Sequence, residues 1–208
     1  MRRIAFVSLI TLLSVALVVA PAAAQSEPSI GGQAPTFSLP DTHGGTHDLA
    51  QYHGKWVVLE WLNYDCPFVG KHYRTGNIPS QQEKWTKQGV VWLAIVSSAP
   101  GKQGYFPPDE MNARSEKEGS HATAVLLDPD GTVGHLYGAR TTPHMFVIDP
   151  EGVVRYMGGI DDVPSARAAD LDHAHQLVDQ ALTEAMAGKP VSVPTSRPYG
   201  CSVKYGSE

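Results

Sequence analysis

An apolar segment that leads into a cysteine and a proline constrains the fold of this chain more than any other feature. Residues 56–62 are almost continuously apolar, and turn residues bound them on both sides. A run of this length predicts a central strand buried on both faces of a sheet. Cys66-Pro67 follows after a three-residue turn, and proline is favoured at the first position of a helix. The sequence therefore predicts a buried strand, a turn, and a helix that begins at Cys66.

Other apolar runs alternate with helical patterns along the chain. Further core strands are expected at residues 90–96 and 123–127, and strands at 145–148 and 153–157 flank a turn and form an antiparallel hairpin. A first hairpin is expected before the core. The pattern predicts an α/β fold, a central mixed sheet with helices on both faces. The expected helices span residues 67–74, 80–87, 108–117, 133–137 and 165–187, the last with one apolar stripe.

The two ends of the chain differ from this core. Residues 1–24 have a charged start, an apolar run and an alanine-rich end, which is typical of a cleaved secretory signal; a retained membrane anchor is the alternative. Residues 25–187 are expected to form one domain. Three prolines punctuate residues 188–208, which predicts an extended, mobile tail that carries Cys201. We expect export to the periplasm or the cell exterior, with no stable membrane span once the signal is removed.

Charge and motifs exclude several classes of function. Loss of Arg2 and Arg3 with the signal leaves 14 Lys and Arg against 21 Asp and Glu, a formal net charge of −7. This acidic balance argues against nucleic acid or an anionic membrane as a partner. The chain has no GxSxG elbow and no phosphate-binding glycine loop before a helix, which argues against hydrolase and nucleotide-binding functions. The sequence predicts no bound cofactor.

The chain contains two cysteines, Cys66 and Cys201, and an exported location permits a disulfide between them. Such a bond is either a structural staple or part of a redox cycle. The unpaired amides and the dipole at a helix N-terminus favour the thiolate, so the predicted position of Cys66 lowers its pKa. Asp65 opposes this effect as a neighbouring negative charge. We therefore expect Cys66 to be a moderately acidic, reactive thiol.

Two further features accompany the predicted strand and helix. Glu60 lies within the apolar run, where burial raises the pKa of a carboxyl group and suits it to proton transfer. The alternative is a carboxylate exposed at the margin of the sheet. Pro143 opens a later strand, and a cis Thr142-Pro143 bond beside a reactive thiol leaves backbone groups free to hold an extended substrate. The sequence does not define the isomer.

These residues together resemble the thioredoxin superfamily, in its exported branch related to alkyl hydroperoxide reductase and thiol-specific antioxidant proteins, the redoxins or peroxiredoxin-like proteins. The resemblance spans about residues 29–187, and the segment 200–205 is similar to the ending of one redoxin subgroup. It implies a thioredoxin-like fold with Cys66 as the reactive cysteine. It also implies that Glu60 is the buried carboxylate and that Pro143 is the cis-proline of these proteins.

The chain also departs from both family patterns. Val69 stands where thioredoxins have a second cysteine, so no disulfide can form within the helix. Asn63 and Pro143 stand where peroxiredoxins have a Thr or Ser and an Arg. Arg140 is a candidate substitute, at a different spacing. Catalytic roles are predicted for Cys66, Cys201, Glu60 and Pro143, and substrate contacts for Asn63, Pro67, Thr142 and Arg140.

The resulting hypothesis is a thiol-dependent oxidoreductase. Cys66 attacks the disulfide of a protein or a hydroperoxide, Cys201 resolves the intermediate, and another thiol protein supplies the electrons. Two alternatives remain. One is a non-catalytic binding protein with a permanent Cys66–Cys201 staple, and the other is a copper-handling protein that uses Cys66 and His144, with His72 as a further ligand.

Overall fold

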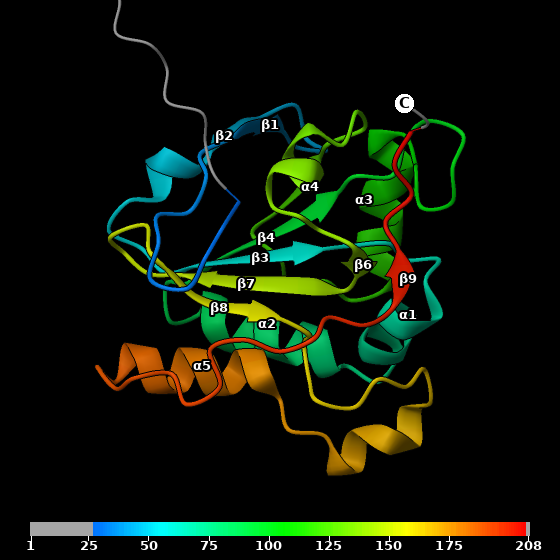
Figure 1. Cartoon of the computed structure of the whole chain (residues 1–208). Helices are drawn as coiled ribbons and strands as arrows, with labels where there is room; N and C mark the ends of the chain where they lie inside the picture. Colours follow the sequence, from blue (N-terminus) through cyan, green and yellow to red (C-terminus); the bar gives the residue numbers. More distant parts are fainter. Residues whose placement is uncertain (1–26, 207–208) are drawn as a thin grey trace, which may run out of the picture.

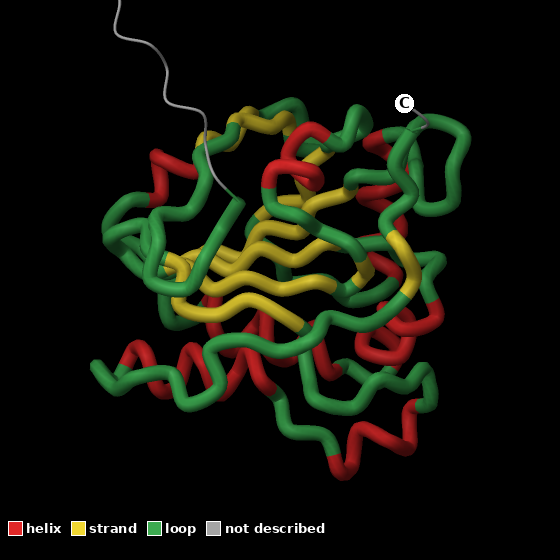
Figure 2. The backbone as a smooth tube through the Cα atoms, in the orientation of Figure 1, coloured by secondary structure: helices red, strands yellow, loops and turns green. Residues whose placement is uncertain are grey.

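The computed structural model describes residues 27–206, and its core is a five-stranded mixed sheet (Figures 1 and 2). The strand order is β5-β4-β3-β7-β8, in which β3, β4 and β5 are parallel and β7 is antiparallel to both of its neighbours. The predicted mixed sheet and the hairpin at its edge are confirmed. The strands are β3 (Val57–Trp61), β4 (Val91–Val96), β5 (Ala124–Leu127), β7 (His144–Ile148) and β8 (Val154–Gly158).

Helices cover both faces of this sheet, as the sequence predicts. Every residue of β3 is buried, because its apolar side chains point alternately into two separate cores. One core includes side chains of α1 (Pro67–Arg74), α2 (Asn77–Thr86), α3 (Pro108–Lys117) and α5 (Leu177–Met186). The other lies under α4 (Thr132–Leu136), the short 3₁₀ helix η1 (Leu49–Tyr52) and the N-terminal hairpin of β1 (Ser38–Pro40) and β2 (Thr46–Asp48).

The predicted helix at residues 165–187 is wrong, because the segment forms two separate elements. A 3₁₀ helix, η2 (Ala168–His173), precedes α5, and His175 lies exposed between them. The amide of His175 donates to the Asp162 carboxylate at 2.9 Å instead of continuing a helix. The expected single apolar stripe across both elements is therefore absent.

The C-terminal tail is extended, as expected, but it is packed across the edge of the sheet (Figure 1, red). The Met157 amide of β8 donates to the Pro194 carbonyl at 3.1 Å, and the Ser196 amide donates to the Met157 carbonyl at 3.2 Å. Further on, β9 (Cys201–Ser202) pairs antiparallel with β6 (Thr141–Thr142). Backbone hydrogen bonds hold this tail at several points of the structure.

The predicted signal segment, residues 1–24, lies outside the described residues. Within residues 27–206, no helix combines the length and the apolar character needed to cross a bilayer. The longest helices there, α2, α3 and α5, have 10 residues each, about half of the ~20 that a membrane span requires.

Candidate redox site

A tight turn after β3 places Cys66 directly before α1. The Asn63 side chain, which is buried, accepts a hydrogen bond from the Asp65 amide at 2.9 Å, and the Cys66 amide donates to the Asn63 carbonyl at 3.0 Å. The Cys66 carbonyl then accepts the first helical hydrogen bond, from Gly70 at 2.8 Å. Pro67 occupies the first helical position, where its missing amide proton costs nothing. The predicted helix start is confirmed, and Asn63 shapes the turn from within the protein.

The Cys66 thiol faces the chain segment that contains the cis-proline. It is 1% exposed and donates a hydrogen bond to the Thr142 carbonyl at 3.2 Å. The Thr142-Pro143 peptide bond is cis, as the resemblance implies. Cys201 lies directly opposite Thr142 in the β6–β9 pair, and residues opposite each other in antiparallel strands have Cα atoms about 4.5–5.5 Å apart. The tail thus brings the second cysteine, also a free thiol, beside the first.

A glycine makes this close approach of the tail possible. Gly200 has a φ of 137°, and a Cβ atom at this position would overlap the Thr142 carbonyl oxygen. Only a residue without a side chain fits here without a shift of the backbone. Gly200 is therefore the residue that lets the tail reach the Cys66 thiol.

The two thiols differ in acidity. Burial raises the pKa of Cys66, but hydrogen bonds with the Cys201 thiol, the Thr142 hydroxyl, and the amides of Val69 and Cys201 together hold that pKa below its ordinary value. The Thr142 hydroxyl is buried and has no hydrogen-bond partner besides this thiol. Burial and the neighbouring Cys66 raise the pKa of Cys201 to about 11. Cys66 therefore ionises first, and Cys201 stays protonated and stabilises the thiolate.

Asp65, expected to oppose the thiolate, has a charged partner that the sequence analysis did not find. Arg114 of α3 forms an ion pair with the Asp65 carboxylate at 2.9 Å and lies 3.6 Å from the centre of the Phe106 ring. The Gln103 side chain also donates to the Asp65 carbonyl at 3.2 Å. The negative charge beside the thiol is thus balanced. The sequence alone does not reveal this ion pair, because Arg114 is 49 residues from Asp65 and lies in a polar helix.

Glu60 is completely buried, so the alternative of an exposed carboxylate is wrong. Burial raises the pKa of Glu60 to about 7, although three hydrogen bonds lower it. Tyr73 donates to one carboxylate oxygen at 3.0 Å, and Gln82 and Trp92 donate to the other at 3.1 and 2.8 Å. Cys66 is not among these partners. Glu60 can therefore store a proton near neutral pH, and any exchange with Cys66 must pass through another group.

Arg140 does not reach the thiol. Its side chain is exposed and lines a cavity together with His144 and Phe146. Phe146 belongs to the core on the face of the sheet opposite to Cys66. The geometry therefore gives no support to the prediction that Arg140 contacts a substrate held at Cys66.

The structure also contradicts the copper alternative, because neither of its proposed histidine ligands faces Cys66. Side chains alternate along β7, so His144 points with Phe146 to one face of the sheet, while Met145 packs on the other face in the core that contains Cys66. His72 points elsewhere, since its two ring nitrogens contact Asn77 at 2.7 Å and the Tyr199 hydroxyl at 3.1 Å. Within residues 27–206, no three His, Cys, Asp or Glu side chains gather as a metal site.

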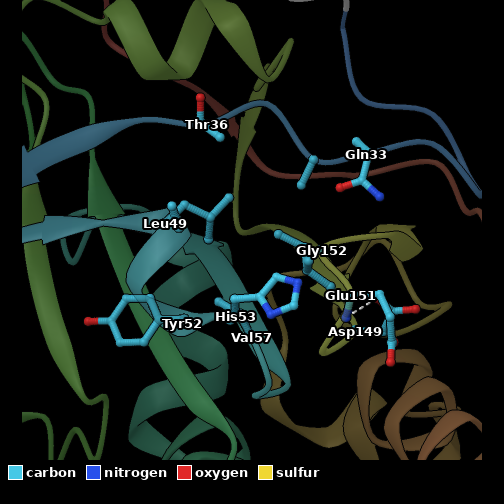
Figure 3. Close-up of a pocket in the computed structure, with 12 residues that line it drawn as sticks. Gln33, Thr36, Leu49, Tyr52, His53, Val57, Asp149, Glu151 and Gly152 are labelled. Atoms are coloured by element: carbon cyan, nitrogen blue, oxygen red, sulfur yellow. Dashed lines mark hydrogen bonds between the residues drawn. The ribbon is translucent and has the colours of Figure 1, made fainter.

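A separate cavity lies at the end of β3 that is remote from Cys66 (Figure 3). Its one buried carboxylate, Asp149, already accepts hydrogen bonds from the Glu151 and Val153 amides at 3.0 and 2.8 Å. Neither cysteine lines it. The labelled lining residues are Gln33, Thr36, Leu49, Tyr52, His53, Val57, Asp149, Glu151 and Gly152. This cavity is therefore separate from the thiol pair.

The sheet, the cis-proline and the cysteine before α1 define a thioredoxin-like protein. The solution structure of a putative thioredoxin from Neisseria meningitidis matches 74% of this chain and 92% of its own with a TM-score of 0.52 at 24% identity. The crystal structure of the hypothetical protein SMc02350 from Sinorhizobium meliloti 1021 matches 88% and 98% with a TM-score of 0.70 at 25% identity. Residues 30–157 match the AhpC/TSA family, and the chain belongs to this family. The resemblance inferred from the sequence is confirmed.

Curated relatives fall into two groups. The selenocysteine-containing peroxiredoxin PrxU of Peptoclostridium acidaminophilum is 28% identical over 136 residues, which are 61% of this chain and 66% of PrxU. The thiol-disulfide oxidoreductase ResA of Geobacillus thermodenitrificans (strain NG80-2) is 29% identical over 135 residues, 61% of this chain and 67% of ResA. The chain thus spans about two thirds of the length of these relatives. Their names agree with the predicted class, an oxidoreductase of uncertain substrate.

Proposed function

We propose that this chain is an exported thiol-dependent oxidoreductase in which Cys66 is the nucleophile and Cys201 the resolving thiol. One observation carries the proposal: the tail holds Cys201 beside a buried Cys66 whose pKa is lowered, while the pKa of Cys201 is raised. Membership of the AhpC/TSA family supports the same chemistry. Export rests on residues 1–24, whose sequence is typical of a secretory signal.

The reaction with a disulfide balances without a cofactor. The Cys66 thiolate attacks one sulfur of the substrate disulfide, forms a mixed disulfide and releases the first substrate thiolate. Cys201 loses its proton, attacks the Cys66 sulfur and releases the second substrate thiol. The substrate is reduced by two electrons, and the protein holds a Cys66–Cys201 disulfide.

A hydroperoxide is the second candidate substrate, and the Thr142 hydroxyl favours it. This hydroxyl is buried, lies near the Cys66 thiol and has no other hydrogen-bond partner, so it can turn from the thiolate to donate to a peroxide oxygen. The thiolate would take the terminal oxygen, release an alcohol or water and become a sulfenic acid, which Cys201 converts to the disulfide with loss of water. Asn63 is engaged in its turn and Arg140 faces away, so the disulfide substrate has the stronger support.

Regeneration needs two electrons from another thiol protein. Cys201 is the more exposed cysteine, and Cys66 is the more acidic and therefore the better leaving group. We propose that the reductant attacks the Cys201 sulfur and expels the Cys66 thiolate. Pro143 fixes the Thr142 carbonyl against the thiol, and Pro67, exposed next to Cys66, is placed to contact the incoming protein.

Turnover of single-cysteine variants tests the proposal. Reduction of a protein disulfide and of hydrogen peroxide is measured with excess dithiol for the native chain, Cys66→Ser and Cys201→Ser. We expect no turnover in Cys66→Ser and slow or stalled turnover in Cys201→Ser. Unchanged turnover in Cys66→Ser would refute the proposal.

The reduction potential separates a redox pair from a permanent staple. Structural disulfides have potentials below about −300 mV, and cycling pairs have higher ones. We expect the Cys66–Cys201 pair to lie above that value in a glutathione titration. A lower value would support the non-catalytic binding protein.

A further inference from the structure

A cluster of buried polar side chains joins the tail to the helix that follows Cys66. Lys71 and His72 of α1, Asp161 of the loop after β8, and Tyr199 of the tail are all inside the protein. We call these four residues the tail latch. The Lys71 ammonium lies 3.5 Å from the Asp161 carboxylate, and both side chains are fully buried. Such a pair adds little net stability, because the desolvation of the two charges offsets most of their attraction.

The Tyr199 hydroxyl is the centre of the tail latch. It donates to the Asp161 carboxylate and accepts from Lys71 at 3.2 Å. Asn77 donates to one ring nitrogen of His72, which leaves the proton on the other nitrogen, and that nitrogen donates to the Tyr199 hydroxyl at 3.1 Å. Burial, and next the Lys71 charge, lower the pKa of His72 to about 3, so its ring is neutral. The hydroxyl therefore uses one donor and two acceptor positions, all with buried partners.

The position of Tyr199 in the chain connects the tail latch to the thiol pair. Tyr199 is two residues before Cys201, and Gly200 between them lies against the Thr142 carbonyl. On the other side, Phe68, two residues after Cys66, packs edge-on against the Tyr199 ring with the ring centres 5.9 Å apart. The tail latch thus anchors the tail immediately before the cysteine that faces Cys66.

Backbone contacts also hold the chain after Cys201. The Val203 amide donates to the Arg140 carbonyl at 3.0 Å, and the Lys204 carbonyl accepts from the Ala99 amide at 2.8 Å. Tyr205 donates to the Ala139 carbonyl at 2.7 Å. Cys201 is therefore fixed from both sides. The anchor before it contains the buried Lys71–Asp161 ion pair.

We propose that Tyr199 is a positioning residue that, through the tail latch, keeps Cys201 in register with Cys66 and closes the tail over the Cys66 thiol. The tail latch then changes two rates in opposite directions. It speeds closure of the Cys66–Cys201 disulfide, and it restricts access of outside reagents to Cys66, which is 1% exposed in the docked state. The first effect rests on the proposed function, whereas the second depends only on the position of the tail.

The test uses Tyr199→Phe, which keeps the ring and removes the hydroxyl. We expect the fold to be retained, because Lys71 and Asp161 can still pair in this variant. A hydrogen bond to charged groups shifts an equilibrium by roughly tenfold or more. We therefore expect Cys66 to react with iodoacetamide roughly tenfold faster when Tyr199→Phe is combined with Cys201→Ser. In the variant that keeps both cysteines, we expect the intramolecular disulfide to form several-fold more slowly after addition of diamide.

Tyr205→Phe is the matched control, because it removes one hydrogen bond from the tail on the other side of Cys201. We expect it to leave both rates close to those of the native chain. Unchanged rates in Tyr199→Phe, or equal changes in both variants, would overturn the proposed role of the tail latch. If Tyr199→Phe speeds the alkylation of Cys66 but leaves the turnover of the chain with both cysteines unchanged, the result supports the tail latch and counts against Cys201 as the resolving thiol. The two proposals can therefore fail separately.

Discussion

Replacement of Glu60 by glutamine tests the effect of the buried carboxylate on the pH dependence of stability. Burial raises the pKa of Glu60 from 4.5 to about 7 in the folded protein. Below pH 4.5 the carboxyl is protonated in both the folded and the unfolded chain. Between these two values the unfolded chain releases the proton and the folded chain keeps it, so the free energy of unfolding falls with rising pH. Above about pH 7 both forms are ionised and the loss is complete.

The size of this loss follows from the pKa shift. One pKa unit corresponds to about 1.4 kcal/mol, so a shift from 4.5 to about 7 makes the native chain lose about 3 kcal/mol between pH 4.5 and 8. Glu60→Gln cannot ionise and lacks this loss. Its amide keeps one oxygen for Trp92 and Gln82, and its nitrogen faces the Tyr73 hydroxyl, which can rotate to accept.

Urea unfolding from pH 4.5 to 8.5 measures the effect. The difference in the free energy of unfolding between the native chain and Glu60→Gln removes the contribution of all other titrating groups. We expect this difference to change by about 3 kcal/mol in favour of the variant as the pH rises. Glu116→Gln removes an exposed carboxylate and is the control, for which we expect a small, flat difference. Parallel curves for the native chain and Glu60→Gln would refute the reasoning, because they would mean that Glu60 ionises equally in both states.

Three further changes probe the thiol pair and its surroundings. Cys201→Ala removes a hydrogen bond that stabilises the Cys66 thiolate, so the pKa of Cys66 should rise, and the pH dependence of its alkylation measures this; an unchanged pKa would contradict the contact. Gly200→Ala should displace the tail and slow disulfide closure at least tenfold, whereas Gly206→Ala, whose Cβ would make an ordinary contact with the Ala99 Cβ at 3.7 Å, should not; equal rates would contradict the close approach. Lys71→Met leaves a buried carboxylate unpaired and should lower the free energy of unfolding by roughly 3–5 kcal/mol in urea; a change under 1 kcal/mol would mean that water reaches the carboxylate.

Much of the core could be predicted because local sequence determines it. The run at residues 56–62 has one stable location, the middle of a sheet, and Cys66-Pro67 directly after it has the form of a helix start. Glu60 within that run was correctly expected to be buried. These features depend on neighbours in sequence, so pattern and propensity are sufficient to find them.

The parts that could not be predicted depend on contacts between distant residues. The prolines of the tail indicate an extended chain but not the surface that it covers. The pairing of Cys201 with Thr142, the tail latch around Tyr199 and the ion pair of Asp65 with Arg114 all join segments that are far apart in sequence. The break before α5 was missed for the same reason, since a side chain of the preceding loop takes the His175 amide.

The orientation of side chains at the site was also beyond the sequence. Arg140 and His144 are close to Pro143 in the chain, which made them candidates for the Cys66 site. The alternation along β7 turns His144 to the opposite face of the sheet, and Arg140 lines the same cavity. Only the register of the strand with its neighbours decides which face a given residue occupies.

The most direct test of Cys66 as the nucleophile is the mass of the trapped intermediate. Cys201→Ser is treated with a small disulfide or with hydrogen peroxide, and the masses of the intact protein and of its peptides are measured by mass spectrometry. We predict one adduct per chain on Cys66, a mixed disulfide or a sulfenic acid captured with dimedone, and no adduct at residue 201 in Cys66→Ser under the same conditions. Modification of Cys201 in Cys66→Ser at the native rate, with no adduct on Cys66 in Cys201→Ser, would contradict the assignment.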